Sequence, residues 1–430
     1  MLRPQPDLNR CFKDENLASW TRLDDGAVIT VYFSNKSISC PHAGVCKFSG
    51  VKVKYTNNML YKKIFSDYVY PIATISGTII GVGIFSLPYI ASKVGILVML
   101  AYFLFLGTLV IFVHQFFGEI SLRTPDFKRL PGFAKIYLGK KGEAVAYITT
   151  ILGLLGALLA YLIVGGEFLE GLFSPVFGGS NFVYTLFYFA AGSALIFFGI
   201  KAVKRMEFWG VLLFSGAIAA IFIKALPVFR IENFFPPIDI NYLFFPYGAV
   251  LFSLWGASLI PEVEEMLGPR KKLLKKIIPV SILIPIFVSL FFIAVILGAT
   301  GERTTESALL GLKESLGGGV VSFGIVFGVL TTFTSFIALG LTLKKVFIFD
   351  LGLKNSHAFI ITCFAPLILF LLGLKSFILV ISFVGGVLLS IDGILILLMY
   401  QKIKGKKFVI LPLLLVFIFA VVYQLVYFLM

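Results

Sequence analysis

Residues 77–88 read GTIIGVGIFSLP, inside the first long apolar segment of the chain. This stretch disfavours an uninterrupted helix, because glycine costs about 1 kcal/mol relative to alanine in a helix interior and proline about 3 kcal/mol. In a bilayer, the backbone groups freed by such a break need a polar partner, so breaks are tolerated where they line a cavity. The stretch therefore predicts a helix interrupted within the membrane. On spacing alone, Gly77 and Gly81 could equally form a close-packing face for a neighbouring helix.

The composition indicates an integral membrane protein. Of the 430 residues, 59% are hydrophobic and 14% are charged, with a mean hydropathy of +0.98, whereas a soluble domain carries about 25% charged residues. The net charge of +15 does not indicate a nucleic-acid partner, because the basic residues lie in short clusters between apolar segments. The chain has four cysteines, but Cys363 lies inside an apolar segment, so no disulfide framework with an even number of cysteines is implied. Nothing in the sequence calls for a cofactor or a metal.

Two regions of the chain differ in composition. Residues 1–58 form a polar leader, which we expect to be poorly ordered or a small accessory segment, and residues 59–430 form a transmembrane domain. The leader has no signal peptide and a few β-leaning stretches, such as 27–33. Its Cys40, His42 and Cys46 match no common zinc finger, so a poorly ordered leader is the better interpretation. Because Met59 is itself a plausible start, the sequence leaves open whether the leader belongs to the working protein.

About eleven apolar segments are long enough to span a bilayer. They lie at 69–92, 94–122, 143–173, 181–200, 205–229, 241–267, 277–299, 317–343, 358–373, 376–400 and 408–430. Lysine and arginine concentrate in alternate loops, at 123–141, 201–205, 270–276, 344–354 and 402–407. Since basic loops stay in the cytoplasm, we expect a multi-pass protein of the plasma membrane with a cytoplasmic N-terminus and an external C-terminus.

A second interrupted segment supports the first. Residues 246–262 read PYGAVLFSLWGASLIPE, and this span crosses in the opposite direction to the first. Two broken helices at matching places in halves of inverted topology are the best sequence pointer to a substrate site near the bilayer midplane. At the first break, the amides of Gly81, Gly83 and Ile84 would present a positive dipole end to a carboxylate.

These residues resemble a known family. The motif GVGIFSLPY at 81–89 is similar to the opening motif of the amino acid/auxin permeases and the aromatic amino acid permeases, both of the amino acid, polyamine and organocation superfamily. Three later stretches agree: 247–262, TSF at 334–336 followed by DLGLK at 350–354, and FVGG at 383–386. The resemblance covers about residues 65–430, and its motifs are specific for the superfamily but weak for the substrate.

The resemblance implies an all-α, LeuT-like fold, in which spans one to five and six to ten form inverted repeats, the first and sixth helices are broken and the eleventh is peripheral. It also implies a substrate site. The residues expected to bind the substrate are Thr78, Gly81, Val82, Gly83, Ile84, Tyr161, Phe252, Ser253, Trp255 and Gly256. Phe252 would close over the solute as a gate. Tyrosines in apolar helices more often pack against neighbours, which is the alternative for Tyr161.

Coupling to an ion has several candidate groups. Hydroxyls cluster at 331–335, and relatives that use sodium place such hydroxyls opposite the broken first helix, so Thr334 and Ser335 are candidates. Bonding to their own helix backbone is the commoner role of such residues. His114 is the deepest ionisable candidate for a proton, although a histidine satisfied by a neighbouring helix is the simpler reading. Of the other ionisable residues within spans, Glu119, Lys224 and Asp392 are expected toward helix ends, where they can pair at the interface, and Glu167 lies past the middle of the long third span.

The predicted function is that of a secondary active transporter, a permease or symporter for small neutral or aromatic amino acids, driven by a proton or sodium gradient through alternating access. The aromatic permeases favour protons. The alternative is a transporter-like sensor or channel without net coupled transport, signalling through the leader. An enzyme is not expected, because the sequence contains neither an H-E-x-x-H nor a G-x-S-x-G pattern.

Overall fold

The computed structural model describes residues 20–22, 28–32, 52–53, 63–125, 128–199, 203–237, 242–405 and 407–429. The chain divides into two compact units, Met1–Asp67 and Tyr68–Met430. In the first unit, three short strands, β1 (Trp20–Arg22), β2 (Val28–Tyr32) and β3 (Lys52–Val53), pair antiparallel in that order. The strand β2 falls inside the β-leaning stretch at 27–33. Cys40, His42 and Cys46 lie outside the described residues.

All the regular secondary structure among the described residues of the second unit is helical. Its first half contains α2 (Tyr70–Ile79), η3 (Val82–Ser86), α3 (Leu87–Arg123), α4 (Leu130–Phe177), α5 (Asn181–Phe198), α6 (Val203–Ala225), η4 (Leu226–Val228) and η5 (Ile231–Phe234), with the turn η2 (Phe65–Val69) before α2. The second half contains α7 (Pro246–Leu254), η7 (Ala257–Leu259), α8 (Ile260–Leu267), η8 (Gly268–Leu273), α9 (Leu274–Thr300), η9 (Gly301–Arg303), α10 (Leu309–Leu316), α11 (Gly318–Lys345), η10 (Val346–Asp350), α12 (Asn355–Leu371), α13 (Phe377–Phe383), η11 (Val384–Leu389), α14 (Ser390–Lys404) and α15 (Lys407–Leu429).

Each of the eleven predicted spans has a helical counterpart within the described residues. Among the described residues, eight continuous helical stretches are long and apolar enough to cross a membrane, and one of them, Pro246–Arg303, covers the sixth predicted span from residue 246 onward and all of the seventh. The first two predicted spans meet at Lys93, and the structure interrupts α3 two residues later, at Gly95, whose φ is 79°. Gly139, with φ 75°, interrupts α4 in the same way before the third span. The short helix α10 was not predicted, because its eight residues are too few for a membrane-spanning segment.

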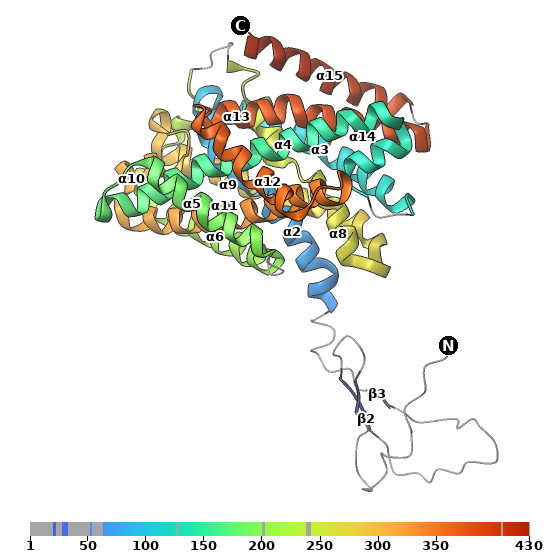
Figure 1. Ribbon diagram of the computed structural model, residues 1–430. Helices are drawn as coiled ribbons and strands as arrows, with labels where there is room; N and C mark the ends of the chain where they lie inside the picture. Colours follow the sequence, from blue (N-terminus) through green and yellow to red (C-terminus); the bar gives the residue numbers. More distant parts are fainter. Residues whose placement is uncertain are drawn as a thin grey trace, which may run out of the picture. The chain divides into compact units, whose positions relative to one another are not determined.

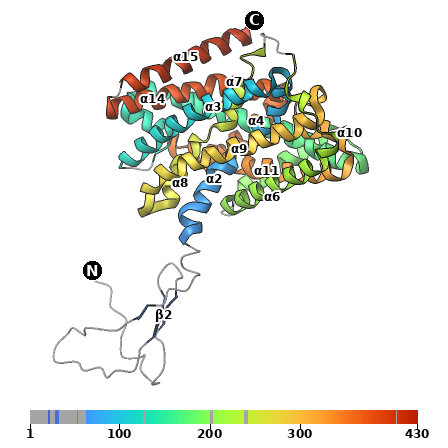
Figure 2. The same ribbon diagram turned by 180° about the vertical axis from the view of Figure 1, so that it is seen from behind.

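The core of the second unit forms where the long helices cross. The helix α3 packs on α9, and α11 packs on both α4 and α6, whereas α15 runs along one edge of the bundle beside α14 (Figures 1 and 2). The edge position of α15 agrees with a peripheral eleventh span. Its outward residues, such as Phe408 and Leu429, are exposed and apolar, as a lipid-facing surface requires.

Aromatic packing fixes the segment that follows the first break. The ring of Phe85 in η3 is fully buried and meets Phe168 of α4, Phe214 of α6 and Phe292 of α9 edge to face, with centroids 4.8, 5.5 and 5.8 Å away. Such pairs contribute about 0.5–1.5 kcal/mol each beyond the area they bury. The break is therefore held on a rigid frame of three other helices.

The glycines of the FVGG motif also have a packing role. A Cβ on Gly385 of η11 would collide with the backbone oxygen of Gly248 in α7, so the two backbones touch. Nearby, the hydroxyl of Tyr247 hydrogen-bonds Ser390 at 3.1 Å. The sixth and tenth spans are thereby joined next to the second break.

Candidate functional site

The first span is broken after Ile79. Ile80 donates the last helical bond, to the carbonyl of Ser76, and its ψ of 48° leaves the helical region. Gly81 follows with ψ −143°, and a tight helix resumes at Val82. A Cβ on Gly81 would overlap the hydroxyl of Tyr161, so only glycine fits at this position without a shift. The break predicted from residues 77–88 is confirmed.

The sixth span is broken at Trp255, whose ψ of 115° is extended, and Gly256. The two breaks lie against each other. A Cβ on Gly256 would come within 2.8 Å of the Ile79 side chain, and one on Gly83 would come within 2.5 Å of the Ser253 hydroxyl and 2.9 Å of the Phe252 ring. Interrupted backbone from both halves of the chain therefore meets at one place.

His114 of α3 closes one side of the second break. Its Nε2 accepts the hydrogen bond of the Gly256 amide at 2.9 Å, and its ring meets Trp255 edge to face at 4.9 Å. A ring nitrogen that accepts an N–H carries no proton, so the imidazole is neutral in this arrangement. The geometry agrees with a histidine that satisfies a neighbouring helix, the simpler of its two sequence readings.

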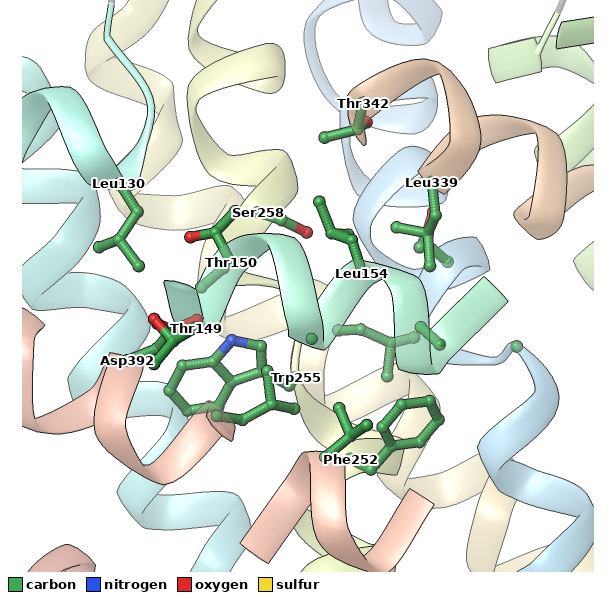
Figure 3. Close-up of a pocket in the computed structure, with 18 of the residues that line it drawn as sticks. Leu130, Thr149, Thr150, Leu154, Phe252, Trp255, Ser258, Leu339, Thr342 and Asp392 are labelled. Atoms are coloured by element: carbon green, nitrogen blue, oxygen red, sulfur yellow. The ribbon is translucent and has the colours of Figure 1, made fainter. Parts of the chain in front are cut away.

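A cavity begins at the two breaks and runs between α4, α8, α11 and α14. It leaves about 90 Å³ for the centres of water-sized molecules, and one water needs about 10–15 Å³ by this measure. Six of the predicted binding residues line it: Thr78, Gly81, Gly83, Tyr161, Phe252 and Trp255. Phe252 and Trp255 present their rings to this space (Figure 3). A solute in the cavity can therefore reach both breaks.

The other four predicted binding residues do not line this cavity. Val82 and Ile84 are buried in the core, and the Ser253 hydroxyl donates to the carbonyl of Ala249 at 2.7 Å. Gly256 gives its amide to His114. These four residues are therefore packed against, or bonded to, other parts of the protein.

Several cavity residues were not among the predicted site residues. The polar ones are Thr149 and Thr150 of α4, Ser258 of η7, Thr342 of α11, Arg129 and Asp392. The pair Thr149-Thr150 is a visible polar signal in an otherwise apolar span, but only the fold shows which way it faces. Asp392 was expected near a helix end at the interface, and that expectation is wrong: the residue is 6% exposed and faces the cavity.

The hydroxyls of α11 mostly bond within their own helix. Thr334 donates to the carbonyl of Thr331 at 3.0 Å, and Thr331 and Thr332 donate to carbonyls one turn earlier. Ser335 differs, since its hydroxyl lies 3.5 Å from the carbonyl of Gly77 in α2. Neither Thr334 nor Ser335 lines the cavity at the two breaks.

Ion pairs surround the far end of the cavity. Arg129, which lines it, binds Glu262 of α8 at 2.8 Å and lies 3.7 Å from Asp350 of η10. Lys345 of α11 binds the same Glu262 at 2.8 Å. These bonds cross from the broken sixth span to the third and eighth spans, so they hold together elements that must separate if the cavity is to open at this end.

Comparison with known proteins assigns the chain to a family. Residues 66–427 match the sequence model of the tryptophan/tyrosine permease family. The chain belongs to the tryptophan/tyrosine permease family. This permease is therefore a multi-pass membrane protein that transports amino acids, and it is not an enzyme.

A curated relative and a solved structure agree with the assignment. The permease is 26% identical over 336 residues to the tyrosine-specific transport system 1 of Haemophilus influenzae, covering 72% of this chain and 82% of the relative. It also matches the crystal structure of MhsT in complex with L-phenylalanine, with a TM-score of 0.66 and 15% identity, over 82% of this chain and 98% of that one. At that identity the second likeness shows the fold alone, which is the predicted LeuT-like fold.

Proposed function

We propose that this chain transports aromatic amino acids, tyrosine and tryptophan first among them, by alternating access. The observation that carries the proposal is the meeting of the two helix breaks at one cavity with aromatic walls. The named transport of tyrosine by the relative from Haemophilus influenzae supports the same substrate class.

In this proposal the first break binds the amino acid backbone. The amides at Gly81 and Gly83 begin a half-helix, and the first amides of a helix have no partner within it and carry its positive dipole end. They would bind the α-carboxylate. The carbonyls at the end of α2 have no helical partner for the same reason, and they suit the α-ammonium group.

The substrate ring would lie among Tyr161, Phe252 and Trp255. All three line the cavity, and Phe252 and Trp255 are half-buried beside the two breaks. Offset and edge-to-face contacts with such rings favour an aromatic side chain over an aliphatic one. Phe252, which touches Gly83, is placed to cover the bound solute.

We propose a proton gradient as the driving force. Thr334 already donates its hydroxyl hydrogen within α11, as an ordinary helical threonine does. A sodium ion is the second candidate, and the observation in its favour is Ser335 beside the Gly77 carbonyl, because hydroxyl and carbonyl oxygens suit a hard cation.

The proposed location is the plasma membrane, with the basic end of the bundle in the cytoplasm. Arg129 and Lys404 lie in two of the basic loops, 123–141 and 402–407. Each forms an ion pair with a carboxylate, Arg129 with Glu262 and Lys404 with Glu119. Residues 59–430 form the transport domain in this proposal and residues 1–58 an accessory leader. Uptake that survives deletion of residues 1–58 would support this division, and loss of uptake with intact membrane insertion would count against it.

Uptake into proteoliposomes tests the proposed function. The purified full chain would be offered labelled tyrosine, tryptophan, phenylalanine, leucine and lysine, with a pH gradient or a sodium gradient imposed or withheld. We expect uptake of the aromatic amino acids, driven by the pH gradient. Equal uptake of leucine and tyrosine would contradict the aromatic site, and no uptake of any amino acid would contradict the transport proposal.

A further inference from the structure

Asp392 lies in the first turn of α14, three residues after the π-helical segment η11. It is 6% exposed and faces the same cavity as the two helix breaks. A carboxylate this deep in a membrane bundle is costly, so such residues usually pair with a cation or serve a function. In the described part of the chain, no lysine, arginine or histidine forms a salt bridge with it.

Thr149 of α4 is the hydrogen-bond partner of Asp392, and the two side chains point toward one another in Figure 3. The Thr149 hydroxyl has two further acceptors within reach, the carbonyls of Val145 at 3.2 Å and Ala146 at 3.3 Å. A hydroxyl has one hydrogen and can serve only one of these three acceptors at a time. Its oxygen remains free to accept a hydrogen bond.

The pair therefore has two fully bonded states. When Asp392 is ionised, Thr149 donates its hydrogen to the carboxylate. When Asp392 is protonated, its O–H donates to the Thr149 oxygen, and the threonine hydrogen turns to the carbonyl of Val145 or Ala146. Neither state leaves a buried hydrogen unbonded, so the change of protonation adds no cost of an unsatisfied donor.

The pair of Asp392 and Thr149 lies along the cavity from the first break. Tyr161, which touches Gly81, follows Thr149 on the same helix by twelve residues (161 − 149), or about 18 Å at 1.5 Å per residue. Asp392, which is bonded to Thr149, therefore lines the same cavity about three helical turns along α4 from the first break.

Other titratable groups on the elements around α14 have partners of their own. Glu119 of α3 binds Arg123, Lys404 and Tyr400, and His114 binds the Gly256 amide. From α4, Tyr147 donates to the carbonyl of Asp350, and Tyr161 lies at the first break. The described part of α15 offers Tyr423 and Tyr427, η11 offers no titratable side chain, and Arg129 across the cavity is bound to Glu262.

We propose that Asp392, positioned by Thr149, is the group that carries the coupled proton, an inference that rests on the proposed transport function. Asp392 takes a proton from water on its carboxylate oxygen while the site faces outward. When the cavity opens toward Arg129, that O–H bond breaks, the proton passes to cytoplasmic water, and the Thr149 hydrogen returns to the carboxylate. No other reactant is needed.

Asp392→Asn tests the proposal, because the amide keeps the shape of the side chain but cannot release a proton. The full-length variant would be reconstituted in proteoliposomes with the membrane potential clamped and an inward pH gradient of about one unit, which can drive up to about a tenfold accumulation at one proton per substrate. We expect tyrosine accumulation in the wild type and equilibration without accumulation in the variant. Exchange of labelled for unlabelled tyrosine should persist in the variant and lose its pH dependence.

Two further variants keep the test sharp. Glu167→Gln, a carboxyl-to-amide change in α4 outside the cavity lining, should accumulate tyrosine as the wild type does. Thr149→Val should move the pH profile of uptake to higher pH, because the ionised carboxylate loses its donor, whereas Thr149→Ser should keep the profile.

Accumulation by Asp392→Asn at the wild-type level would overturn the proposal. If that variant fails to exchange tyrosine at all, Thr149→Val decides, and an unchanged pH profile there would overturn it. A wild type that accumulates tyrosine on a sodium gradient but not on a pH gradient would also overturn it, yet leave the transport function standing. A wild type that neither accumulates nor exchanges amino acids would contradict the proposed function itself.

Discussion

The two helix breaks have different neighbours. At the first break, Gly81 and Gly83 face the cavity and contact Tyr161 and Phe252. At the second break, the freed amide of Gly256 is already bound by His114, and it does not face the cavity. The first break therefore has backbone that a ligand in the cavity can reach. At the second break the backbone amide is bonded by a side chain, and Trp255 forms part of the cavity wall.

The largest effect is expected from crowding the first break. Gly83→Leu would drive a side chain into Ser253 and Phe252, whose atoms lie within 2.9 Å of the first carbon added. Overpacking costs about 1–3 kcal/mol, and every 1.4 kcal/mol is a factor of ten in binding. Tyrosine uptake should therefore fall about 5- to 150-fold, while the variant still inserts into the membrane. Normal uptake by an inserted variant would show that the first break does not hold the substrate.

A smaller substitution at the same break, Gly81→Ala, creates a clash that a second substitution can relieve. Gly81→Ala should impair uptake because its methyl group meets the Tyr161 hydroxyl. Adding Tyr161→Phe removes that oxygen, so the double variant should recover part of the lost uptake. Initial rates of the two single variants and the double variant form a cycle that measures the coupling. Strict additivity of the two effects would mean that Tyr161 and Gly81 do not share the site.

At the second break, the expected loss is mainly one of stability. His114→Ala leaves the Gly256 amide buried without an acceptor, and an unsatisfied buried donor costs about 1–3 kcal/mol. The apparent melting temperature of the purified variant should fall, and the pH profile of uptake should keep its shape. A flattened pH profile in a stable His114→Ala protein would instead make this histidine the proton carrier.

The smallest effect is expected from the hydroxyls of α11. Thr334→Ala removes a bond that only returns to its own helix, so stability and uptake should change little. Ser335→Ala is the informative neighbour, since its hydroxyl lies beside the Gly77 carbonyl. Both variants should transport tyrosine equally well with and without sodium. A selective loss of sodium-dependent uptake in Ser335→Ala would establish the cation site.

Most of the fold could be predicted from local sequence. Glycine and proline mark both breaks, because their effect on a helix is a property of the backbone at that residue. Apolar length predicted the spans, and only the kinks at Gly95 and Gly139 and the short helix α10 needed the structure. The direction that a residue faces could not be predicted, because adjacent helical residues such as Val82 and Gly83 point to different neighbours.

The same limit explains the polar residues that the sequence did not assign. Asp392 and Thr149 are 243 residues apart in the chain, and their bond arises only from the packing of α14 on α4. His114 and Gly256 meet across 142 residues for a similar reason. A sequence shows that a polar residue lies in an apolar span, but its partner is a property of helix packing.

A structure of the full chain with L-tyrosine bound is the most direct test of the first break as the ligand site. The account predicts the α-carboxylate within hydrogen-bond distance, about 2.7–3.2 Å, of the amides at Gly81 and Gly83, and the phenol ring among Tyr161, Phe252 and Trp255. Tyrosine bound elsewhere, with the first span running as one continuous helix beside it, would contradict the account.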